Sequence, residues 1–421
     1  MTIAVDPSCL DDFEVGSIST AAARRRILEA AAPLAGAERV HLRAALGRVL
    51  GGDIASPLAV PGHTNSAMDG YAVAIASLPS SGTAELTVAG SSFAGHPFNG
   101  VVATGQCVRI MTGAVMPADT DTVIPQEHAE TLSGARIRID DRHREGQNVR
   151  RAGEDIRRGD IVAPRGRRLA APDLGLLASL GVGEVTVTRR PRVAFFSTGD
   201  ELRSLGDRLE PGEIYDSNRY TLYGMLIGLG ADIIDMGVVA DTPEATLDAF
   251  RRAAADADVV ITSGGVSVGE ADYIKDSVAA LGSIEFSKVA MKPGRPLTFG
   301  RVGEALFFGL PGNPVSVMVT FYLFVQPALR RLAGESDVQP LILRARCQSK
   351  LRKKPGRTEY QRGILASDAT GELTVERTGP QGSGILSSMA QANCFIVLPA
   401  DFETAEAGDS VPVIPFGELR L

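Results

Sequence analysis

The sequence is poor in the residues that most often mark a metal or redox centre. It contains four cysteines, none in a C-x-x-C pair, so the spacing predicts neither a zinc site nor a dithiol redox site. Sparse cysteine use is typical of a reducing compartment, and we expect a cytoplasmic protein. Residues 1–15 lack the apolar stretch of a secretory signal peptide, and polar residues and a proline interrupt the apolar run at 315–329. We therefore expect no membrane segment.

The chain also lacks an excess of basic residues. Its 421 residues carry a formal net charge of −7, which argues against sequence-independent binding to nucleic acid. A local basic cluster could still bind a small anion. Apolar residues make up 44% of the chain, as in ordinary globular proteins, and the length suggests about three domains.

The spacing of apolar residues changes several times along the chain. Residues 18–50 have helical spacing, with a second amphipathic stretch at 40–50. Residues 56–165 contain short alternating runs between glycine and proline turns, which predict a β-rich module. From 191 to about 334, predicted strands and helices alternate, the pattern of a parallel, doubly wound α/β sheet. Short alternating runs return after 335 and predict a small β-barrel or sandwich.

Within the α/β part, the periodicity predicts individual elements. A helix is expected at 217–229, and a second helix begins after Thr242, an N-cap residue followed by Pro243, and ends near 257. A long apolar helix is expected after Pro314. Strands are predicted at 193–196, 233–239, 258–261, 284–290 and 305–310.

Acidic side chains follow the predicted strands of this sheet. Asp200 and Glu201 come after the first strand, Asp241 after the second and Asp272 after the third. The carboxyl ends of parallel strands meet at one edge, where α/β proteins bind ligands. Clustered carboxylates repel one another unless a cation intervenes, and Mg²⁺ prefers oxygen ligands. Capping of a helix is the alternative role for each acid taken singly.

The loop TSGGVSVGEAD (262–272) contains the G-x-S-x-G pattern of a hydrolase, with Ser267 at the nucleophile position. In that fold the histidine follows the serine in the chain, but all five histidines precede Ser267. The Walker and G-x-G-x-x-G patterns are absent as well. Gly264, Gly265 and Gly269 would let backbone amides approach an anion closely. The loop is therefore interpreted as a phosphate cradle, with Ser267 as a donor.

A cluster of cations follows this loop. Lys288 precedes the segment KPGRP (292–296), in which two prolines and a glycine fix a turn that carries Lys292 and Arg295. Most surface lysines are simply solvated and bind nothing, but a turn fixed by two prolines favours an ordered anion site. Carboxylates, cations and glycine-rich amides together suit phosphoryl or phosphoanhydride chemistry.

The β-rich module adds a second group of polar turns, including Asp69 within NSAMDGYA and Thr112 within RIMTGA. Taken alone, each is interpreted as a structural turn. Asp69 could face the sheet edge only across a domain or subunit boundary, a common place for active sites.

These motifs together resemble those of one family. The chain is similar to the molybdopterin molybdenumtransferase (MoeA) family, which includes the E-domain of gephyrin. The resemblance covers nearly the whole chain in order, and Arg295 stands where the family often has lysine, which keeps the charge and changes the hydrogen-bond geometry. The motifs that carry it are NSAMDGYA (65–72), RIMTGAVMPADTDTVIPQE (109–127), AGEDI (152–156), STGDEL (197–202), SGGVSVGEADY (263–273), KPGRP (292–296), GLPGNPVS (309–316) and GILSSMAQANCFIVLP (384–399).

The resemblance implies an architecture. It predicts an elongated helical and β linking and dimerisation domain at 18–55 plus 149–190, and a β-rich insertion domain at 56–148. A central doubly wound α/β domain of the molybdopterin-binding, MogA-like type follows at 191–335, and a small C-terminal β-barrel at 336–421. The resemblance also implies a homodimer with each active site between subunits.

The resemblance implies a reaction as well: with Mg²⁺, molybdate is inserted into adenylylated molybdopterin and AMP is released. Transient contact with molybdopterin adenylyltransferase and with cofactor-accepting enzymes is expected. Catalytic residues would be Asp69, Asp241, Asp272, Lys288 and Lys292, and Mg²⁺ would be held by Glu201, Asp241 and Asp272. Substrate-binding residues would be Thr112, Asp155, Gly264, Gly265, Ser267, Gly269, Arg295, Pro311, Asn313, Pro314, Arg362 and Ser383.

Two other functions compete with this prediction. A non-catalytic pterin-binding or scaffolding protein would share the fold, but the acids and lysines of the site are all present. Molybdopterin adenylyltransferase would resemble the α/β domain alone, and the long flanking regions argue against it.

Overall fold

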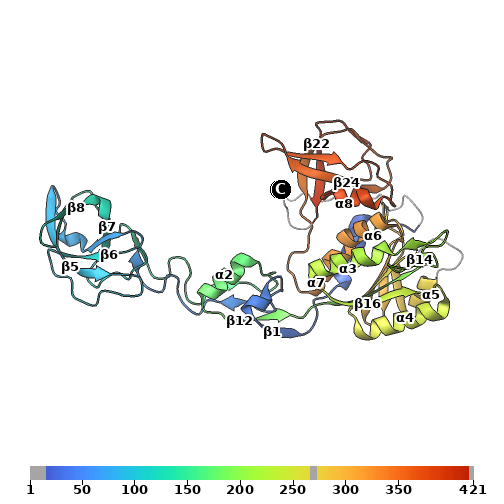
Figure 1. The fold of residues 1–421 in the computed structure, drawn as a ribbon, viewed down its shortest axis with the longest axis horizontal. Helices are drawn as coiled ribbons and strands as arrows, with labels where there is room; N and C mark the ends of the chain where they lie inside the picture. Colours follow the sequence, from blue (N-terminus) through green and yellow to red (C-terminus); the bar gives the residue numbers. More distant parts are fainter. Residues whose placement is uncertain (1–15, 266–272, 417–421) are drawn as a thin grey trace.

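The computed structural model describes residues 16–265 and 273–416. Figure 1 shows an elongated molecule, with a β-rich module at one end, a small linking module in the middle, and an α/β domain with a barrel at the other end. Four described parts therefore follow the order predicted from the sequence.

The central sheet positions the loops that the sequence singled out. Its strand order is β16 (Asp232–Val239), β13 (Arg192–Thr198), β17 (Val259–Ser263), β21 (Ala305–Leu310), β20 (Thr298–Val302) and β18 (Gly282–Phe286). The first four strands are mutually parallel, so the loops after them do lie along one edge. Strand β20 runs antiparallel to both of its neighbours, β21 and β18, so β18 again has the direction of the first four strands. The sequence predicted a parallel sheet, and the hairpin of β20 and β21 makes the sheet mixed. The turn at Gly303 makes this hairpin possible, because β20 and β21 follow each other directly.

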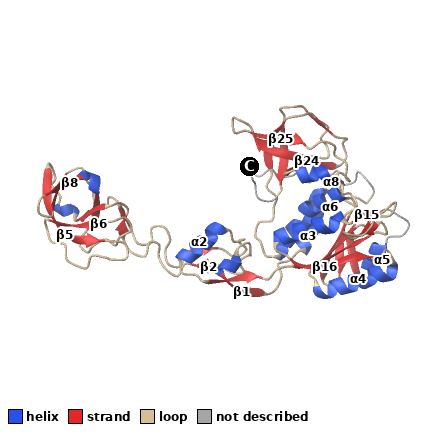
Figure 2. Ribbon diagram, viewed as in Figure 1, coloured by secondary structure: helices blue, strands red, loops and turns tan. Residues whose placement is uncertain are grey.

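Helices cover both faces of this sheet (Figure 2). They are α3 (Ser217–Leu229), α4 (Pro243–Asp256), α5 (Tyr273–Leu281), α6 (Pro314–Thr320) and α7 (Gln326–Leu332), the last two joined by a π-helical segment (Phe321–Val325). The predicted cap of α4 is confirmed, because the Thr242 side chain accepts a hydrogen bond from the Ala245 amide at 3.3 Å.

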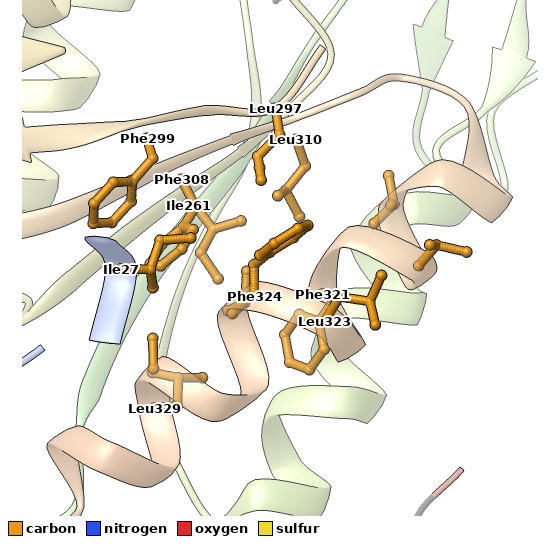
Figure 3. Packing of buried hydrophobic residues seen from close by; sticks show 14 of the residues in the cluster. Ile27, Ile261, Leu297, Phe299, Phe308, Leu310, Phe321, Leu323, Phe324 and Leu329 are labelled. Atoms are coloured by element: carbon orange, nitrogen blue, oxygen red, sulfur yellow. The ribbon is translucent and has the colours of Figure 1, made fainter. Parts of the chain in front are cut away.

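The main core lies between the sheet and the helices α6 and α7. Figure 3 shows Phe299 and Phe308 of the sheet facing Phe324 and Leu329 of the helical segment. Each such side chain, when fully buried, contributes about 1.5–3 kcal/mol to folding. Helix α1 (Thr20–Ala30) also packs into this core through Ile27, although residues 18–55 were expected in the linking domain.

The linking module corrects a second expectation. Residues 40–50 were predicted to be helical, but β1 (Ala37–His41) pairs antiparallel with β12 (Glu184–Thr188), and only a 3-10 turn (Leu42–Ala45) follows. Val185 and Val187 of β12 are buried at alternate positions, and the half-buried Val40 of β1 packs against this cluster, so pairing with a distant segment overrides the local spacing. The module also contains α2 (Ala171–Ser179) and a short ladder of β2 (Ile54–Ala55) with β11 (Ile161–Ala163).

The insertion module is β-rich, as predicted, and has its own buried apolar cores. A two-stranded ladder of β3 (Asn65–Ser66) and β10 (Val149–Arg150) leads into it, and 3-10 turns occur at Ile75–Ser77 and Gln126–His128. Its strand order is β7 (Thr122–Pro125), β4 (Gly70–Val73), β6 (Gln106–Ile110), β5 (Thr83–Ser92), β9 (Arg136–Asp140) and β8 (Ala129–Leu132).

The C-terminal part forms a closed five-stranded barrel, as predicted. Around it run β24 (Thr358–Ser367), β25 (Leu373–Arg377), β22 (Leu343–Cys347), β28 (Ser410–Pro415) and β26 (Cys394–Leu398), which pairs again with β24. Helix α8 (Leu386–Gln391) and the short ladder of β23 (Leu351–Arg352) with β27 (Thr404–Ala405) also belong to this part. In the α/β domain, a short ladder pairs β14 (Leu202–Arg203) with β15 (Ile214–Tyr215).

The barrel is joined to the α/β domain by backbone and by core. Strand β19 (Met291–Lys292) leaves the α/β domain and pairs in parallel with β24. Phe395 of β26 belongs to the same buried cluster as the sheet residues. In the described part of the chain, no helix has the length and hydropathy of a membrane span.

Candidate functional site

A cavity of about 450 Å³ lies between the α/β domain and the barrel, and we call it the interdomain cavity. Three chain segments that are far apart in the sequence form its walls, together with one arginine of the barrel. The residues that line it are Met291, Lys292, Pro293, Gly294, Arg295, Pro296, Asn313, Ser316, Arg357, Gln381, Gly382 and Ser383. The structure thus brings together Lys292, Arg295, Asn313 and Ser383, four of the residues singled out from the sequence.

The turn that carries Lys292 is held from both sides. Lys292 pairs with Glu359 across the β19–β24 ladder, so its backbone belongs to the barrel sheet. Gly294 has a φ of +97°, and a Cβ there would lie 2.6 Å from the Thr320 Cγ2 atom. Only glycine fits so close to α6, which explains the third position of the KPGRP motif.

The charge of the interdomain cavity is positive. Lys292, Arg295 and Arg357 line it, and no described lining residue is acidic. The Lys292 Nζ atom lies 3.4 Å from a carboxylate oxygen of Glu359. The Lys292 side chain is 54% exposed and the Glu359 side chain only 10%, so the lysine reaches over a buried carboxylate toward the cavity.

Arg362 stands behind the cavity wall. It is fully buried, and its guanidinium donates to the carbonyl oxygens of Pro380, Gln381 and Gly382 at 3.0–3.2 Å and to the Ser388 hydroxyl at 3.0 Å. Arg362 therefore holds the loop that carries Ser383. It is not among the described residues that line the interdomain cavity, although the sequence analysis expected it to bind substrate.

Ser383 is tied to the start of α6. Its carbonyl oxygen accepts a hydrogen bond from the Val315 amide at 3.1 Å. The two loops that bear Asn313 and Ser383 therefore approach each other at one wall of the cavity.

The loops after β17 and β21 meet at a second place. Gly264 and Gly265 both have positive φ, and added Cβ atoms would lie 2.5–2.6 Å from the carbonyl and hydroxyl oxygens of Thr198. Asn218 donates to the Ser263 hydroxyl at 2.8 Å and to the Gly312 carbonyl at 2.7 Å, and so joins the two loops. The sequence analysis did not identify Asn218.

Buried polar atoms at this sheet edge have no hydrogen-bond partner among the described residues. They are Ser197 Oγ, Thr198 Oγ1, Thr262 Oγ1, Asp216 Oδ2 and Asn218 Oδ1. Such atoms are costly to leave unsatisfied, and in native proteins they often meet a ligand or water. Ser267, Gly269 and Asp272 of the same loop lie outside the described residues.

Glu201 and Asp241, the expected metal ligands within the described residues, follow the ends of β13 and β16. The carboxylate of Glu201 folds over Gly199, where an added Cβ would lie 2.6 Å from its Oε2 atom. Asp241 is half-buried after β16. Within residues 16–265 and 273–416, no three His, Cys, Asp or Glu side chains are grouped to hold a metal ion.

The other predicted site residues of the α/β domain are Pro311, Pro314 and Lys288, and they lie in loops or at a helix start. Pro311 is buried and Pro314 begins α6, so both shape the loop after β21. Lys288 is half-buried between β18 and β19, and it is not among the described residues that line the interdomain cavity.

Asp69 and Thr112 form a pair in the insertion module. One carboxylate oxygen of Asp69 accepts hydrogen bonds from the Thr112 hydroxyl and amide, both at 2.7 Å. The Thr112 hydroxyl, and after it the amide, lowers the pKa of Asp69. Asp155 is exposed in the segment that returns to the linking module. Figure 1 shows the insertion module at the opposite end of the molecule from the α/β domain, so one chain does not bring Asp69 to Lys292.

Sequence reasoning did not single out the lining residues Ser316, Arg357, Gln381 and Gly382 as site residues. For Arg357 a signal existed, because RKKPGR (352–357) combines cations with a proline–glycine turn, as KPGRP does. Ser316 ends the motif GLPGNPVS (309–316), whereas Gln381 and Gly382 have no such local signal.

Family models match the chain over most of its length. The family model of the MoeA N-terminal region (domains I and II) matches residues 18–181, that of a "Probable molybdopterin binding domain" matches 194–331, and that of the MoeA C-terminal region (domain IV) matches 344–416. The chain is 43% identical over 398 residues to a molybdopterin molybdenumtransferase of Haemophilus influenzae, covering 94% of this chain and 98% of that protein. The chain belongs to the molybdopterin molybdenumtransferase family.

Other relatives agree with membership of this family. Gephyrin of Dictyostelium discoideum is 33% identical and aligns with 91% of this chain and 60% of its own length. A crystal structure of the molybdopterin biosynthesis MoeA protein of Pyrococcus horikoshii superposes with a TM-score of 0.83 at 28% identity, covering 95% of this chain and all 100% of that one. Family membership makes the chain a transferase of molybdenum cofactor biosynthesis.

Proposed function

We propose that this protein inserts molybdenum into molybdopterin, taking adenylylated molybdopterin and molybdate and releasing AMP. The observation that carries the proposal is the interdomain cavity, where Lys292, Arg295 and Arg357 converge without an acidic neighbour among the described lining residues. Such a cavity suits an oxyanion and the phosphoanhydride of a nucleotide-activated substrate.

In this proposal the cations of the cavity act on developing charge. Release of AMP breaks the phosphoanhydride bond, and negative charge grows on the phosphate oxygen that leaves. Lys292 and Arg295 would bind molybdate and stabilise that charge where water is partly excluded. The hydroxyl and amide groups of Ser316, Gln381 and Ser383 offer further donors at the cavity wall.

The phosphates and the pterin would lie along the sheet edge. Gly264 and Gly265 pack tightly against Thr198, beside buried hydroxyls that have no partner among the described residues and could meet a ligand there. We place Ser267 and Gly269 of the same loop, with Pro311, Asn313 and Pro314, in this pocket. Asp155 would contact the substrate from the returning segment of the insertion module.

We propose that Mg²⁺ is bound by Glu201, Asp241 and Asp272. Carboxylate oxygens are the ligands that Mg²⁺ prefers, and its charge would offset that of the phosphates. Glu201 and Asp241 alone are not a metal centre, so the proposal depends on Asp272. Replacing Glu201 or Asp241 by the corresponding amide should raise the Mg²⁺ concentration needed for half-maximal AMP release.

We propose a homodimer in which the insertion module of one subunit completes the site of the other. The distance between the two ends of the molecule in Figure 1 supports a contribution from a second copy. Helix α3 also leaves Tyr220, Tyr223 and Ile227 about half exposed, at 51%, 48% and 53%. Ile227 and the exposed Leu46 line one cavity beside the linking module, whose wall also contains Arg48, Arg168, Arg189 and Arg190, and a second chain could cover these exposed apolar side chains.

The experiment that tests the function measures AMP and metallated cofactor after the purified protein is incubated with adenylylated molybdopterin, Mg²⁺ and molybdate. We expect both products in equal amounts, and Lys292→Ala should lower the rate by about 10²–10³-fold. Lys350→Ala is the matched control, because Lys350 is on the barrel surface and pairs with Glu406. Binding of the substrate without AMP release by the unaltered protein would instead support a non-catalytic scaffold.

A further inference from the structure

A second cavity, of about 460 Å³, lies on the barrel side of the site, and we call it the basic cavity. Its wall contains five cations and a single carboxylate. The residues that line it are Lys292, Arg352, Lys353, Lys354, Pro355, Arg357 and Glu359. Of these residues, the sequence analysis singled out Lys292 alone.

The two cavities share a wall. Lys292 and Arg357 line both of them, so an anion held in the basic cavity lies next to the interdomain cavity. Glu359, the one acid, is already engaged, because it accepts hydrogen bonds from Lys292 at 3.4 Å and from Gln361 at 3.0 Å. Asp401 and Glu403 also act on Lys353 from outside the lining, so Arg352, Lys354 and Arg357 are the cations that have no acid besides Glu359 among the described lining residues.

Hydrogen bonds to a neighbouring loop of the barrel hold the turn that carries these cations. The Lys353 amide donates to the Glu403 carbonyl at 3.1 Å, and the Gly356 amide donates to the Ala400 carbonyl at 2.8 Å. The Lys353 ammonium donates to that same Ala400 carbonyl at 2.9 Å, and burial lowers its pKa. Lys353 thus anchors the turn, while Arg352 and Lys354 project at its exposed edge.

We propose that the basic cavity is a second anion subsite, which holds a tetrahedral oxyanion dianion beside the interdomain cavity before transfer. The inference rests on the proposed function, since it takes that oxyanion to be the second substrate. The whole chain carries a net charge of −7, so its long-range field repels a dianion. A lined recess of positive charge focuses the field locally and raises the concentration of an anion at the entrance.

A small anion suits the cavity better than an acidic segment of a partner protein. The cavity is formed by one turn of the barrel together with Lys292 and Glu359, and it shares Lys292 and Arg357 with the interdomain cavity. An acidic peptide would need an extended basic surface, whereas the described cations here surround a single recess.

The test compares molybdate binding and turnover of the double variant Arg352→Gln/Lys354→Gln with those of the unaltered chain. Both positions line the basic cavity and neither lines the interdomain cavity. Arg377→Gln is the control, because Arg377 is exposed on β25 of the same barrel. Thermal melting checks that the variants are folded, and Arg352→Lys/Lys354→Arg restores the charge.

Equilibrium dialysis with molybdate alone should show that the double variant loses the weaker class of molybdate sites. At low ionic strength its KM for molybdate should rise on the order of tenfold, and the salt dependence of kcat/KM should become shallower. If the double variant bound molybdate and depended on salt as Arg377→Gln does, the subsite would be overturned. The same conclusion would follow if the double variant lost affinity for an acidic peptide but not for molybdate. Because dialysis needs no turnover, loss of the weaker sites in a chain that releases no AMP would support the subsite and refute the proposed function.

Discussion

The Nζ atom of Lys292 lies 3.4 Å from the buried carboxylate of Glu359, across the one ladder that joins β19 of the α/β domain to β24 of the barrel. The pair places an ammonium at the boundary of two cavities. It also couples the position of a cation in the site to the docking of the barrel.

Replacing Glu359 with glutamine tests this coupling. The variant keeps the shape but loses the charge that orients Lys292, so we expect kcat to fall about tenfold. The dissociation constant for molybdate should not rise, because the site then contains one negative charge fewer. Steady-state kinetics and dialysis give the two values. A rise in that dissociation constant with an unchanged kcat would contradict a positioning role.

The glycine-rich turn after β17 gives a prediction on stability. Gly265→Ala adds a side chain at a φ of +67°, with contacts of 2.6 Å to Thr198 Oγ1 and 2.7 Å to Ile274 Cδ1. We expect a loss of about 2–4 kcal/mol in the free energy of unfolding. Gly303→Ala, at a φ of +56° with open space around it, isolates the backbone strain and should cost about 1–2 kcal/mol. Urea denaturation measures both, and equal losses would contradict the packing argument.

The sequence predicted elements that depend on local signals. Helix α3 has the expected bounds, because Asp216 caps its start and Gly230 ends it with a φ of +73°. Residues 40–50 were wrongly predicted as helical, because β1 depends on pairing with β12 far along the chain.

In the candidate site, too, local features could be predicted from the sequence and tertiary contacts could not. The KPGRP turn was recognisable from its composition, whereas the partnership of Lys292 with Glu359 depends on how two domains dock. The burial of Arg362 behind the loop at 380–382 is likewise a tertiary property, and no spacing in the sequence indicates it.

The ion pair of Arg189 and Asp258, next to the start of β17, gives a prediction on how stability depends on pH. Asp258 accepts two hydrogen bonds of 2.7 Å from Arg189 and one of 2.8 Å from the Arg192 amide. Burial alone would raise the pKa of Asp258, but these hydrogen bonds bring it below its ordinary value of 3.8. The stabilisation is therefore complete above pH 3.8 and is lost as the pH falls through the lowered pKa.

Accordingly, Asp258→Asn should cost about 2–3 kcal/mol at neutral pH, and the cost should shrink on acidification. The exposed pair Arg25–Glu29, at 4.0 Å, provides the control, and Glu29→Gln should cost less than about 0.5 kcal/mol. Urea denaturation at neutral and acidic pH gives the comparison. A cost for Asp258→Asn that stays constant with pH would refute the assigned origin.

The Asp69–Thr112 pair can be tested by titration. Thr112→Val removes the hydroxyl donor and keeps the amide, so the pKa of Asp69 should rise toward its ordinary value of 3.8. Carboxyl carbon NMR of aspartate-labelled protein measures that pKa. Thr120→Val is the control, because the Thr120 hydroxyl donates to the Pro117 carbonyl and not to Asp69. An unmoved Asp69 titration in Thr112→Val would show that the hydroxyl does not set the pKa.

The measurement that tests the account most directly is complementation between two inactive variants. Asp69→Asn alters only the insertion module, and Lys292→Ala alters only the two adjoining cavities at the other end of the chain, so each homodimer should be inactive. After subunit exchange, a mixed dimer has one intact site, and an equal mixture should recover about a quarter of the normal AMP release. A mixture that forms mixed dimers by native mass spectrometry and yet stays inactive would contradict a site shared between subunits.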